Sequence, residues 1–320
     1  MAALATIPLS KRSASKLSDI ADASVSSLSR AVYNWLISLR VLSFSELQSG
    51  AREHLIRSIT GAGLKADQNS VQDIFTRIMT RGAQYGLERL ERVAVRKESV
   101  AAAMSFSMVN PFVDQYINSS MLSLITAISI DTRMAISLIL LDAVRRGIAP
   151  RQQARAIEPL IGLTSRQAQA VINYRNALET GNYRATLDRA LRDGRYDARL
   201  LRALKDGSRL SRDQIDQMVR RYAERQLRWR AENIARTESI RAANAGQREA
   251  WRQAMAQGLL PLSLKQHWLI AHDERTCPNC KLIPGMNPNG VDIGGQFQTP
   301  YGPVDQPPAH SSCRCALGLG

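Results

Sequence analysis

The residues of this sequence best suited to metal chemistry lie in two short segments between positions 277 and 315. These segments hold all four cysteines of the chain and one of its four histidines. The candidate ligands are Cys277, Cys280, His310, Cys313 and Cys315. Zn²⁺ takes four thiolate or imidazole ligands in a tetrahedron, and a Cys-x2-Cys turn presents two sulfurs on one side. The spacing therefore predicts a structural zinc site, and it leaves open which four of the five residues bind.

Two other uses of the cysteines are weaker. Disulfides require an oxidising compartment, but the first 16 residues place an apolar patch before their charges, the reverse of a signal peptide. The triplet His272 to Glu274 and the run "CPNC" are similar to the H-x-E and P-C-x-x-C motifs of zinc deaminases. Only two residues separate Glu274 from Cys277, however, and a catalytic zinc needs an open coordination position. The pattern favours a closed site.

A small α+β unit at residues 259–320 must position these ligands. The run "LKQHWLIAH" at 264–272 alternates as a strand does, and "GQFQTPYGPV" predicts a short hairpin around Pro300 to Gly302. A region this small and poor in apolar residues gains much of its stability from a metal. Before it, one long helix is expected from Asp213 to Gln257, ended by Gly258.

The remainder of the chain is predicted to be mainly α-helical. We expect a helical N-terminal region at 1–130 and an Arg-rich helical region at 131–258, because apolar residues recur at steps of three and four. Thr164 with Gln167, and Ser211 with Gln214, fit capping boxes. The most apolar stretch, 119–144, is interrupted by charges before it reaches the ~20 residues that span a bilayer, so no membrane partner is expected.

The charge of the chain is strongly positive. The formal net charge is +15, with 36 Arg against 7 Lys. Such an excess favours phosphate groups or an acidic protein surface as partner, although the Arg residues also alternate with Asp and Glu as on a solvated helix face. The candidate basic contact surface comprises Arg220, Arg221, Arg225, Arg228 and Arg230. It would contact the phosphates of double-stranded DNA without reading bases.

Several motifs in fixed order resemble a known family. "RAENIARTESIRAANAGQREAW" is followed by "HWLIAHDERTCPNCKLIPG" and by "PPAHSSCRC". Together they resemble the phage Mu F-like, or phage head morphogenesis, family of minor capsid proteins over about 131–315. Besides the cysteines and His310, the residues that carry the resemblance are Arg236, Thr237, Glu238, Asn244, Trp268 and Asp273.

The resemblance implies a non-enzymatic, low-copy component of a tailed-phage or prophage head. Such proteins are made beside the portal and major capsid proteins, enter the prohead with the portal, and assist assembly or the passage of DNA. We therefore expect the chain in the virion near the portal, in the host cytoplasm during assembly, and able to form homo-oligomers in the particle. The resemblance also implies that the C-terminal fold is related to the ADP-ribosyltransferase-like group.

Two alternative functions come from other classes. The first is a phage-encoded enzyme similar to ADP-ribosyltransferases, with Glu238 as catalytic carboxylate. It is disfavoured because aromatic residues, which would line a dinucleotide pocket, make up only 5% of the chain. Arg236 and Arg241 also flank Glu238, as in an ion-paired helix face. The second is a zinc-dependent, non-specific nucleic-acid binder, which predicts salt-sensitive DNA affinity.

Overall fold

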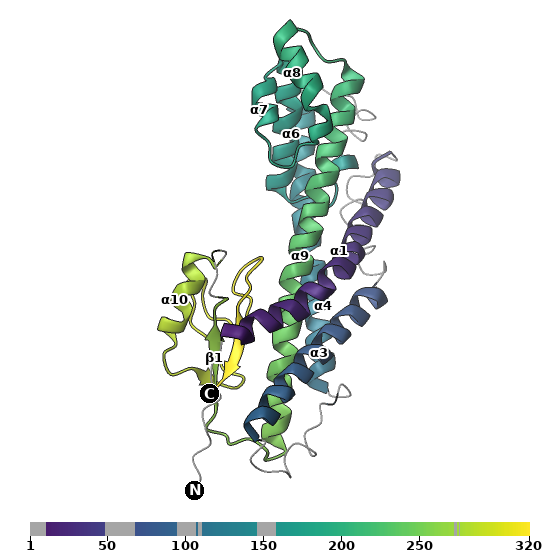
Figure 1. The fold of residues 1–320 in the computed structure, drawn as a ribbon. Helices are drawn as coiled ribbons and strands as arrows, with labels where there is room; N and C mark the ends of the chain where they lie inside the picture. The colour runs from purple at the N-terminus through teal and green to yellow at the C-terminus, as the bar shows by residue number, and fades with distance from the viewer. Residues whose placement is uncertain are drawn as a thin grey trace. The chain divides into compact units, whose positions relative to one another are not determined.

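The computed structural model describes residues 11–48, 68–94, 107, 111–145, 158–271, 274 and 276–320. Its helices are α1 (Lys11–Gln48), α3 (Gln68–Ala94), α4 (Pro111–Arg145), α6 (Ser165–Thr180), α7 (Tyr183–Leu187), α8 (Asp197–Asp206), α9 (Arg212–Ala256) and α10 (Pro278–Met286). Short 3-10 helices occur at Glu158–Leu160 (η2) and Gly194–Tyr196 (η3). The strands are β1 (Lys265–Leu269), β2 (Val291–Asp292) and β3 (Ala316–Leu319). The described residues are thus mostly helical, with one small sheet near the C-terminus (Figure 1).

The described helices include no candidate for a membrane span, because none combines sufficient length with sufficient hydropathy.

The chain divides into two compact units that interleave along the sequence. The first takes residues from Met1–Arg30, Asn69–Ser119 and Glu232–Gly320, and the second from Ala31–Gln68 and Ser120–Ala231. Helix α9 contributes to both. The boundaries of the two units therefore differ from those of the three consecutive segments expected from the sequence. The division into segments 1–130, 131–258 and 259–320 stays a prediction.

In the second unit, α6, α7 and α8 pack around the first half of α9. The predicted capping box at the start of α6 is confirmed. The Thr164 hydroxyl accepts from the Gln167 backbone N–H at 3.3 Å, and the Gln167 side-chain oxygen accepts from the Thr164 backbone N–H at 3.1 Å. The rings of Tyr174 and Tyr222 stack at 4.3 Å between centroids and join α6 to α9. This unit is held by ordinary helix packing.

In the first unit, α3 packs closely against the second half of α9. Both helices carry glycine at the crossing: a Cβ on Gly246 would lie 2.0 Å from the Met79 carbonyl oxygen, and one on Gly82 would lie 2.2 Å from that of Ala243. Backbones can approach this closely only where side chains are missing. The predicted close-packing face of small residues is confirmed, since Ala235, Ala242, Ala243 and Ala245 are buried.

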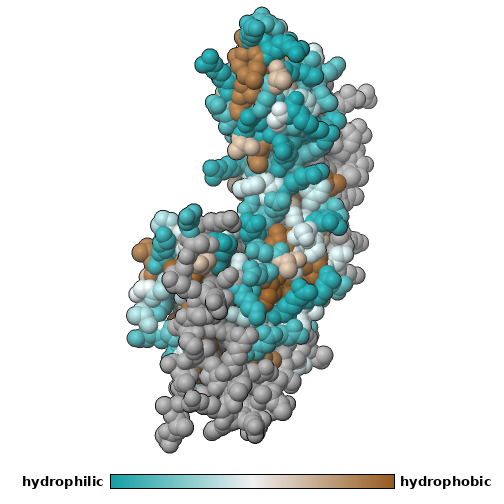
Figure 2. Space-filling view, viewed as in Figure 1, coloured by the Kyte–Doolittle hydropathy of each residue, from teal (hydrophilic) through white to brown (hydrophobic). Residues whose placement is uncertain are grey.

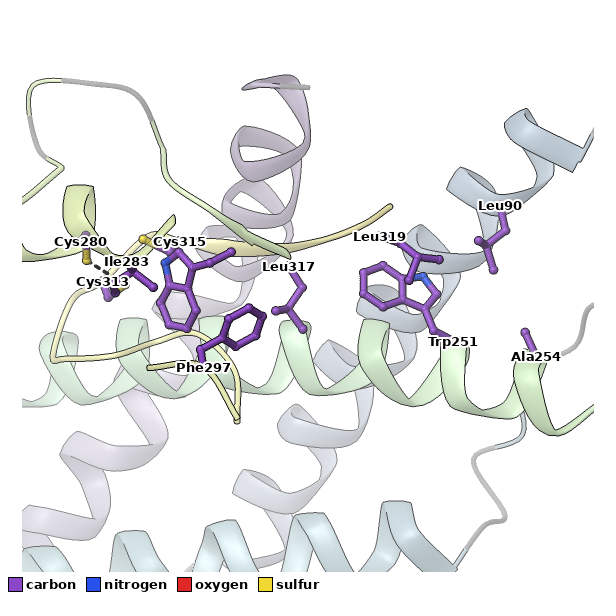
Figure 3. Close-up of a cluster of buried hydrophobic side chains, with 11 residues drawn as sticks. Leu90, Trp251, Ala254, Cys280, Ile283, Phe297, Cys313, Cys315, Leu317 and Leu319 are labelled. Atoms are coloured by element: carbon purple, nitrogen blue, oxygen red, sulfur yellow. Dashed lines mark hydrogen bonds between the residues drawn. The ribbon is translucent and has the colours of Figure 1, made fainter. Parts of the chain in front are cut away.

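The sheet of the first unit has the order β2-β1-β3 and is antiparallel throughout. Strand β1 falls within the predicted strand 264–272, and Trp268 on it pairs with Leu317 on β3. The predicted hairpin is present as a bridge between Phe297 and Val304, closed by a bond from the Gly302 N–H to the Thr299 carbonyl at 3.0 Å. The sheet and α10 enclose an apolar cluster that contains Trp251, Trp268, Phe297 and three of the cysteines (Figure 3).

Candidate metal centre

The start of α10 positions the first two sulfurs. Cys277 is the N-cap residue in an extended conformation, and Pro278 occupies the first turn, where its fixed φ suits a helix start. The Cys280 N–H donates to Cys277 Sγ at 3.3 Å. This bond turns the chain so that both side chains point to the same side, as a metal-chelating Cys-x2-Cys turn requires.

A second turn positions His310 and Cys313. The Cys313 N–H donates to the His310 carbonyl at 3.2 Å. The His310 ring donates from Nδ1 to the Ser311 carbonyl at 2.8 Å, because a carbonyl oxygen can only accept. The lone pair of the neutral ring therefore resides on Nε2, which lies 3.2 Å from Cys277 Sγ and 3.0 Å from Cys280 Sγ.

The structure brings all five predicted ligands together, in two groups that share Cys280. One group is Cys277, Cys280 and His310; the other is Cys280, Cys313 and Cys315; the ligand atoms within each group lie within 4.8 Å of one another. Figure 3 shows Cys280 beside Cys313, with Cys315 close by; the sulfurs of Cys280 and Cys313 are 3.7 Å apart. None of the four cysteines forms a disulfide. Thiolates and a neutral imidazole are the donors that Zn²⁺ prefers, so the residues present fit a closed zinc site.

The thiols influence one another's ionisation. Hydrogen bonds with Cys313 and Cys315, followed by burial, raise the pKa of Cys280, whereas hydrogen bonds from Cys280 and Cys315 lower the pKa of Cys313 to about 2. For Cys315 the bond with Cys280 lowers the pKa, but the bond with Cys313 and burial raise it more, to about 12. Without a cation the cluster thus retains thiol protons, and metal binding would release them.

Helix α9 holds the ligand-bearing loop through polar side chains. The Thr237 hydroxyl donates to the Asn233 carbonyl at 2.7 Å and accepts from the Ser312 backbone N–H at 2.9 Å. The Ser312 hydroxyl donates to the Asn233 amide oxygen at 2.7 Å. Ser312 has φ +60°, a left-handed conformation uncommon for serine, and these contacts stabilise it.

Asn244 fixes the backbone next to Cys315. Its side-chain oxygen accepts from the Leu317 N–H at 2.9 Å, and its amide nitrogen bonds the Cys315 carbonyl at 3.5 Å. The same nitrogen also donates to the Ile240 carbonyl within the helix at 2.9 Å. Asn244 is fully buried, so it satisfies backbone groups at the start of β3 that water does not reach.

Two further contacts extend this interaction along α9. The Gln306 amide donates to the Arg241 carbonyl at 3.0 Å, and Arg248 donates to the Asp305 carbonyl at 3.2 Å. We call the α9 residues of this face the polar row. Its members are Asn233, Thr237, Arg241, Asn244 and Arg248. Steps of four, four, three and four place them on one face of the helix.

Sequence reasoning singled out Thr237 and Asn244 through the family resemblance, but not the polar row as a docking face. The signal was present in the spacing of polar residues at helical steps. It was hidden because α9 is rich in Arg, and polar residues on such a helix usually face solvent.

The other motif residues have structural roles or lie outside the described part. Glu238 is buried, 7% exposed, and accepts from Arg241 at 2.6 and 2.8 Å, as expected from its flanking arginines. Burial raises its pKa, and the charge of Arg241 lowers it in part. Arg236 is exposed, and Trp268 is buried on β1. Asp273 lies outside the described residues.

Four members of the expected basic contact surface are exposed: Arg220, Arg221, Arg225 and Arg228. Three of them already have intramolecular contacts. Arg221 pairs with Glu224 at 2.9 Å, Arg225 donates to the Arg192 carbonyl, and Arg228 lies over the Tyr33 ring at 5.4 Å.

The fifth member, Arg230, was predicted wrongly as a surface residue. It is 5% exposed, donates to the Gly162 carbonyl and pairs with Asp131 at 2.7 Å. It lies two residues after Arg228 on a helix, so it points in a different direction and satisfies a backbone group in the core.

The comparisons with known proteins concern this same part of the chain. Residues 195–318 match a family model described as "Phage Mu protein F like protein". The resemblance deduced from the motifs is thereby confirmed. The match begins at residue 195, later than the expected 131, and it includes the polar row and all five candidate ligands. Comparison with curated proteins and comparison with solved structures each gave no significant match.

Proposed function

We propose that this chain is a non-enzymatic head morphogenesis protein of a tailed phage or prophage, with a C-terminal region clamped by zinc. The observation that carries the proposal is the Phage Mu F like match over the segment that holds both the ligand cluster and the polar row. The segment that matches the family is therefore the segment that contains both the ligand cluster and the polar row.

The residues of the site serve a structural purpose in this proposal. Zn²⁺, when bound, supplies a four-coordinate link between the start of α10 and the loop 310–315. The polar row holds that loop on α9. Together they make a rigid unit with a small apolar core, which suits a docking module in a particle.

The surroundings of Glu238 support the hypothesis that the protein is not an enzyme. A catalytic carboxylate has to face a substrate, whereas Glu238 is buried and accepts two hydrogen bonds from Arg241. Its family position is explained by this ion pair on α9. The relationship of the C-terminal fold to the ADP-ribosyltransferase-like group stays a prediction.

The partners we propose are the portal or capsid proteins, with packaged DNA as a further contact through phosphates. Exposed arginines of α9, such as Arg220, support a contact with an acidic surface or with phosphate. We place the protein in the virion, near the portal, with homo-oligomers formed within the particle and the host cytoplasm as the place of assembly.

The test is incorporation into heads. The chain is co-expressed with the portal and major capsid proteins of the phage or prophage that encodes it, and purified particles are examined by quantitative mass spectrometry. The wild-type chain is expected in the particles, and the double variant Cys277→Ser/Cys280→Ser is expected at a level at least about tenfold lower. Absence of the folded wild-type chain from complete heads would refute the proposal.

A further inference from the structure

Zinc needs four ligands, and the structure offers five donors in two groups that share Cys280. The ligand set of the proposed metal centre, on which this inference rests, follows from their geometry. We infer that Cys277, Cys280, His310 and Cys313 bind the ion, and that Cys315 is a buried thiol belonging to the sheet core.

The two ligand pairs have similar local geometry. Cys277 and Cys280 are three positions apart and joined by a bond from the Cys280 N–H to Cys277 Sγ. His310 and Cys313 are also three apart and joined by a backbone bond of 3.2 Å. Each pair is one turn, and two such turns make the usual halves of a tetrahedral site. His310 Nε2 and Cys313 Sγ both lie near the Cys280 sulfur, at 3.0 and 3.7 Å.

The distance between the sulfurs of Cys280 and Cys313 suits a shared metal ion. With Zn–S bonds of about 2.3 Å, two thiolates of a tetrahedral site lie about 3.8 Å apart. Cys280 Sγ and Cys313 Sγ are 3.7 Å apart, so this edge of the tetrahedron already has the required length. His310 Nε2 lies 3.0 Å from the same Cys280 sulfur, on the lone-pair side of its ring.

Cys315, in contrast, is held by the sheet. It directly precedes β3, and alternation along a strand places its side chain on the same face as that of Leu317. Leu317 pairs with Trp268, so Cys315 is a diagonal neighbour of the Trp268 indole on that face. Asn244 bonds the carbonyl of Cys315 itself and the N–H of Leu317. A shift of Cys315 toward the other donors would break these contacts.

The environment of Trp268 agrees with this role. Its indole is buried, and its Nε1–H makes no close hydrogen bond within the described part of the chain. A buried indole N–H is costly to leave unpaired, and strand register puts the Cys315 thiol, which interacts with this indole, on the same face of the sheet. A thiol kept beside the indole packs as a small apolar group with weak hydrogen-bonding capacity.

The test compares the two neighbouring cysteines in the full-length chain. Cys313 and Cys315 are 2% and 3% exposed and lie in one loop, so the same change at either is a matched pair. Each is replaced by Ala and, in a second variant that better retains size, by Ser. Zinc content is measured by mass spectrometry, and zinc affinity by competition with a chromophoric chelator. The thiolate-to-metal absorption of the cobalt form is recorded for each variant, with circular dichroism as the check of folding.

We expect the Cys315 variants to bind one ion with an affinity within about threefold of wild type and with the same cobalt spectrum. We expect the Cys313 variants to lose at least about tenfold in affinity and to show a weaker thiolate-to-cobalt absorption, because two of three thiolate ligands are left. The reverse result, or equal losses at both positions, would overturn the assignment. A folded wild-type chain that binds no metal would instead refute the metal centre itself, so the two failures are distinguishable.

Discussion

At the scale of single residues, Asn244 has the clearest structural role of the family motif. It replaces the strand partner that β3 lacks on that side, because it binds one backbone carbonyl and one N–H as a neighbouring strand would. A buried side chain with both functions is difficult to replace. The resemblance could identify Asn244 as a family residue, but its role appeared only when α9 and β3 were placed together.

We therefore predict that Asn244→Ala lowers the free energy of unfolding of the first unit by about 2–4 kcal/mol, since two backbone groups lose their partner. Asn173→Ala is the matched control, because Asn173 is exposed on α6 and its side-chain oxygen accepts from Gln169 of the same helix. Chemical denaturation of both variants measures the difference. Equal effects of the two substitutions would show that the Asn244 bonds do not stabilise the fold.

Glu238 gives a prediction about pH. Its folded-state pKa is raised above the ordinary 4.5, so the folded protein holds this proton at pH values where the unfolded chain has lost it. The contribution of Glu238 to stability consequently falls as pH rises from about 4.5 through the raised pKa.

We expect Glu238→Gln to remove this fall, and to leave the variant at least as stable as wild type at neutral pH. Arg241 loses its partner but is 40% exposed, so water compensates. Thermal unfolding from pH 4 to 7 measures the slope, with Glu224→Gln, which breaks the more exposed i,i+3 pair with Arg221, as control. An unchanged slope in Glu238→Gln would contradict the prediction.

At the scale of elements, the sequence predicted long helices better than the small parts of the C-terminal region. The expected helix 213–257 is observed at Arg212–Ala256, because capping residues and Gly258 mark its ends. Strands β2 and β3 and helix α10 were not predicted. A strand of four residues such as "ALGL" is too short to show a hydrophobic periodicity. Cys277 followed by Pro278 is typical both of a metal-binding turn and of a helix start, so the sequence did not distinguish α10 from a turn.

The crossing of α3 and α9 gives a prediction at this scale. Gly246→Ala places a Cβ against the Met79 carbonyl, so the helices must separate, and we expect a loss of about 1–3 kcal/mol despite the better helix propensity of Ala. Gly285→Ala in α10 is the control, because nothing lies within 4 Å of its Cβ position. We expect its stability to be unchanged or to rise by up to about 1 kcal/mol.

Unfolding curves of the two glycine variants decide between packing and propensity. If Gly246→Ala were as stable as Gly285→Ala, the result would contradict the close contact between the backbones of α3 and α9.

At the scale of the whole molecule, we expect the two units to differ in how far their stability depends on metal. The second unit contains none of the cysteines and is held by contacts such as the Tyr174–Tyr222 stack. In the first unit the candidate ligands bring α10 and the loop 310–315 together, and Ile283 of α10 packs in the same buried cluster as Cys313 and Cys315. Length and charge could not predict this division, because the units interleave in sequence.

We expect a chelator to make residues 259–320 susceptible to protease while α6 to α8 and the first half of α9 stay protected, because only the former lose a cross-link. Limited proteolysis with mass spectrometry locates the cuts, and restored zinc is the control. Equal protection with and without chelator would mean that the C-terminal region folds without metal.

The most direct test of the central claim is the metal content of the full-length chain. It is measured by inductively coupled plasma mass spectrometry after purification under reducing conditions without chelator, beside the Cys277→Ser/Cys280→Ser variant. We predict about one zinc ion per wild-type chain and none in the variant. A folded wild-type chain without bound metal would contradict it.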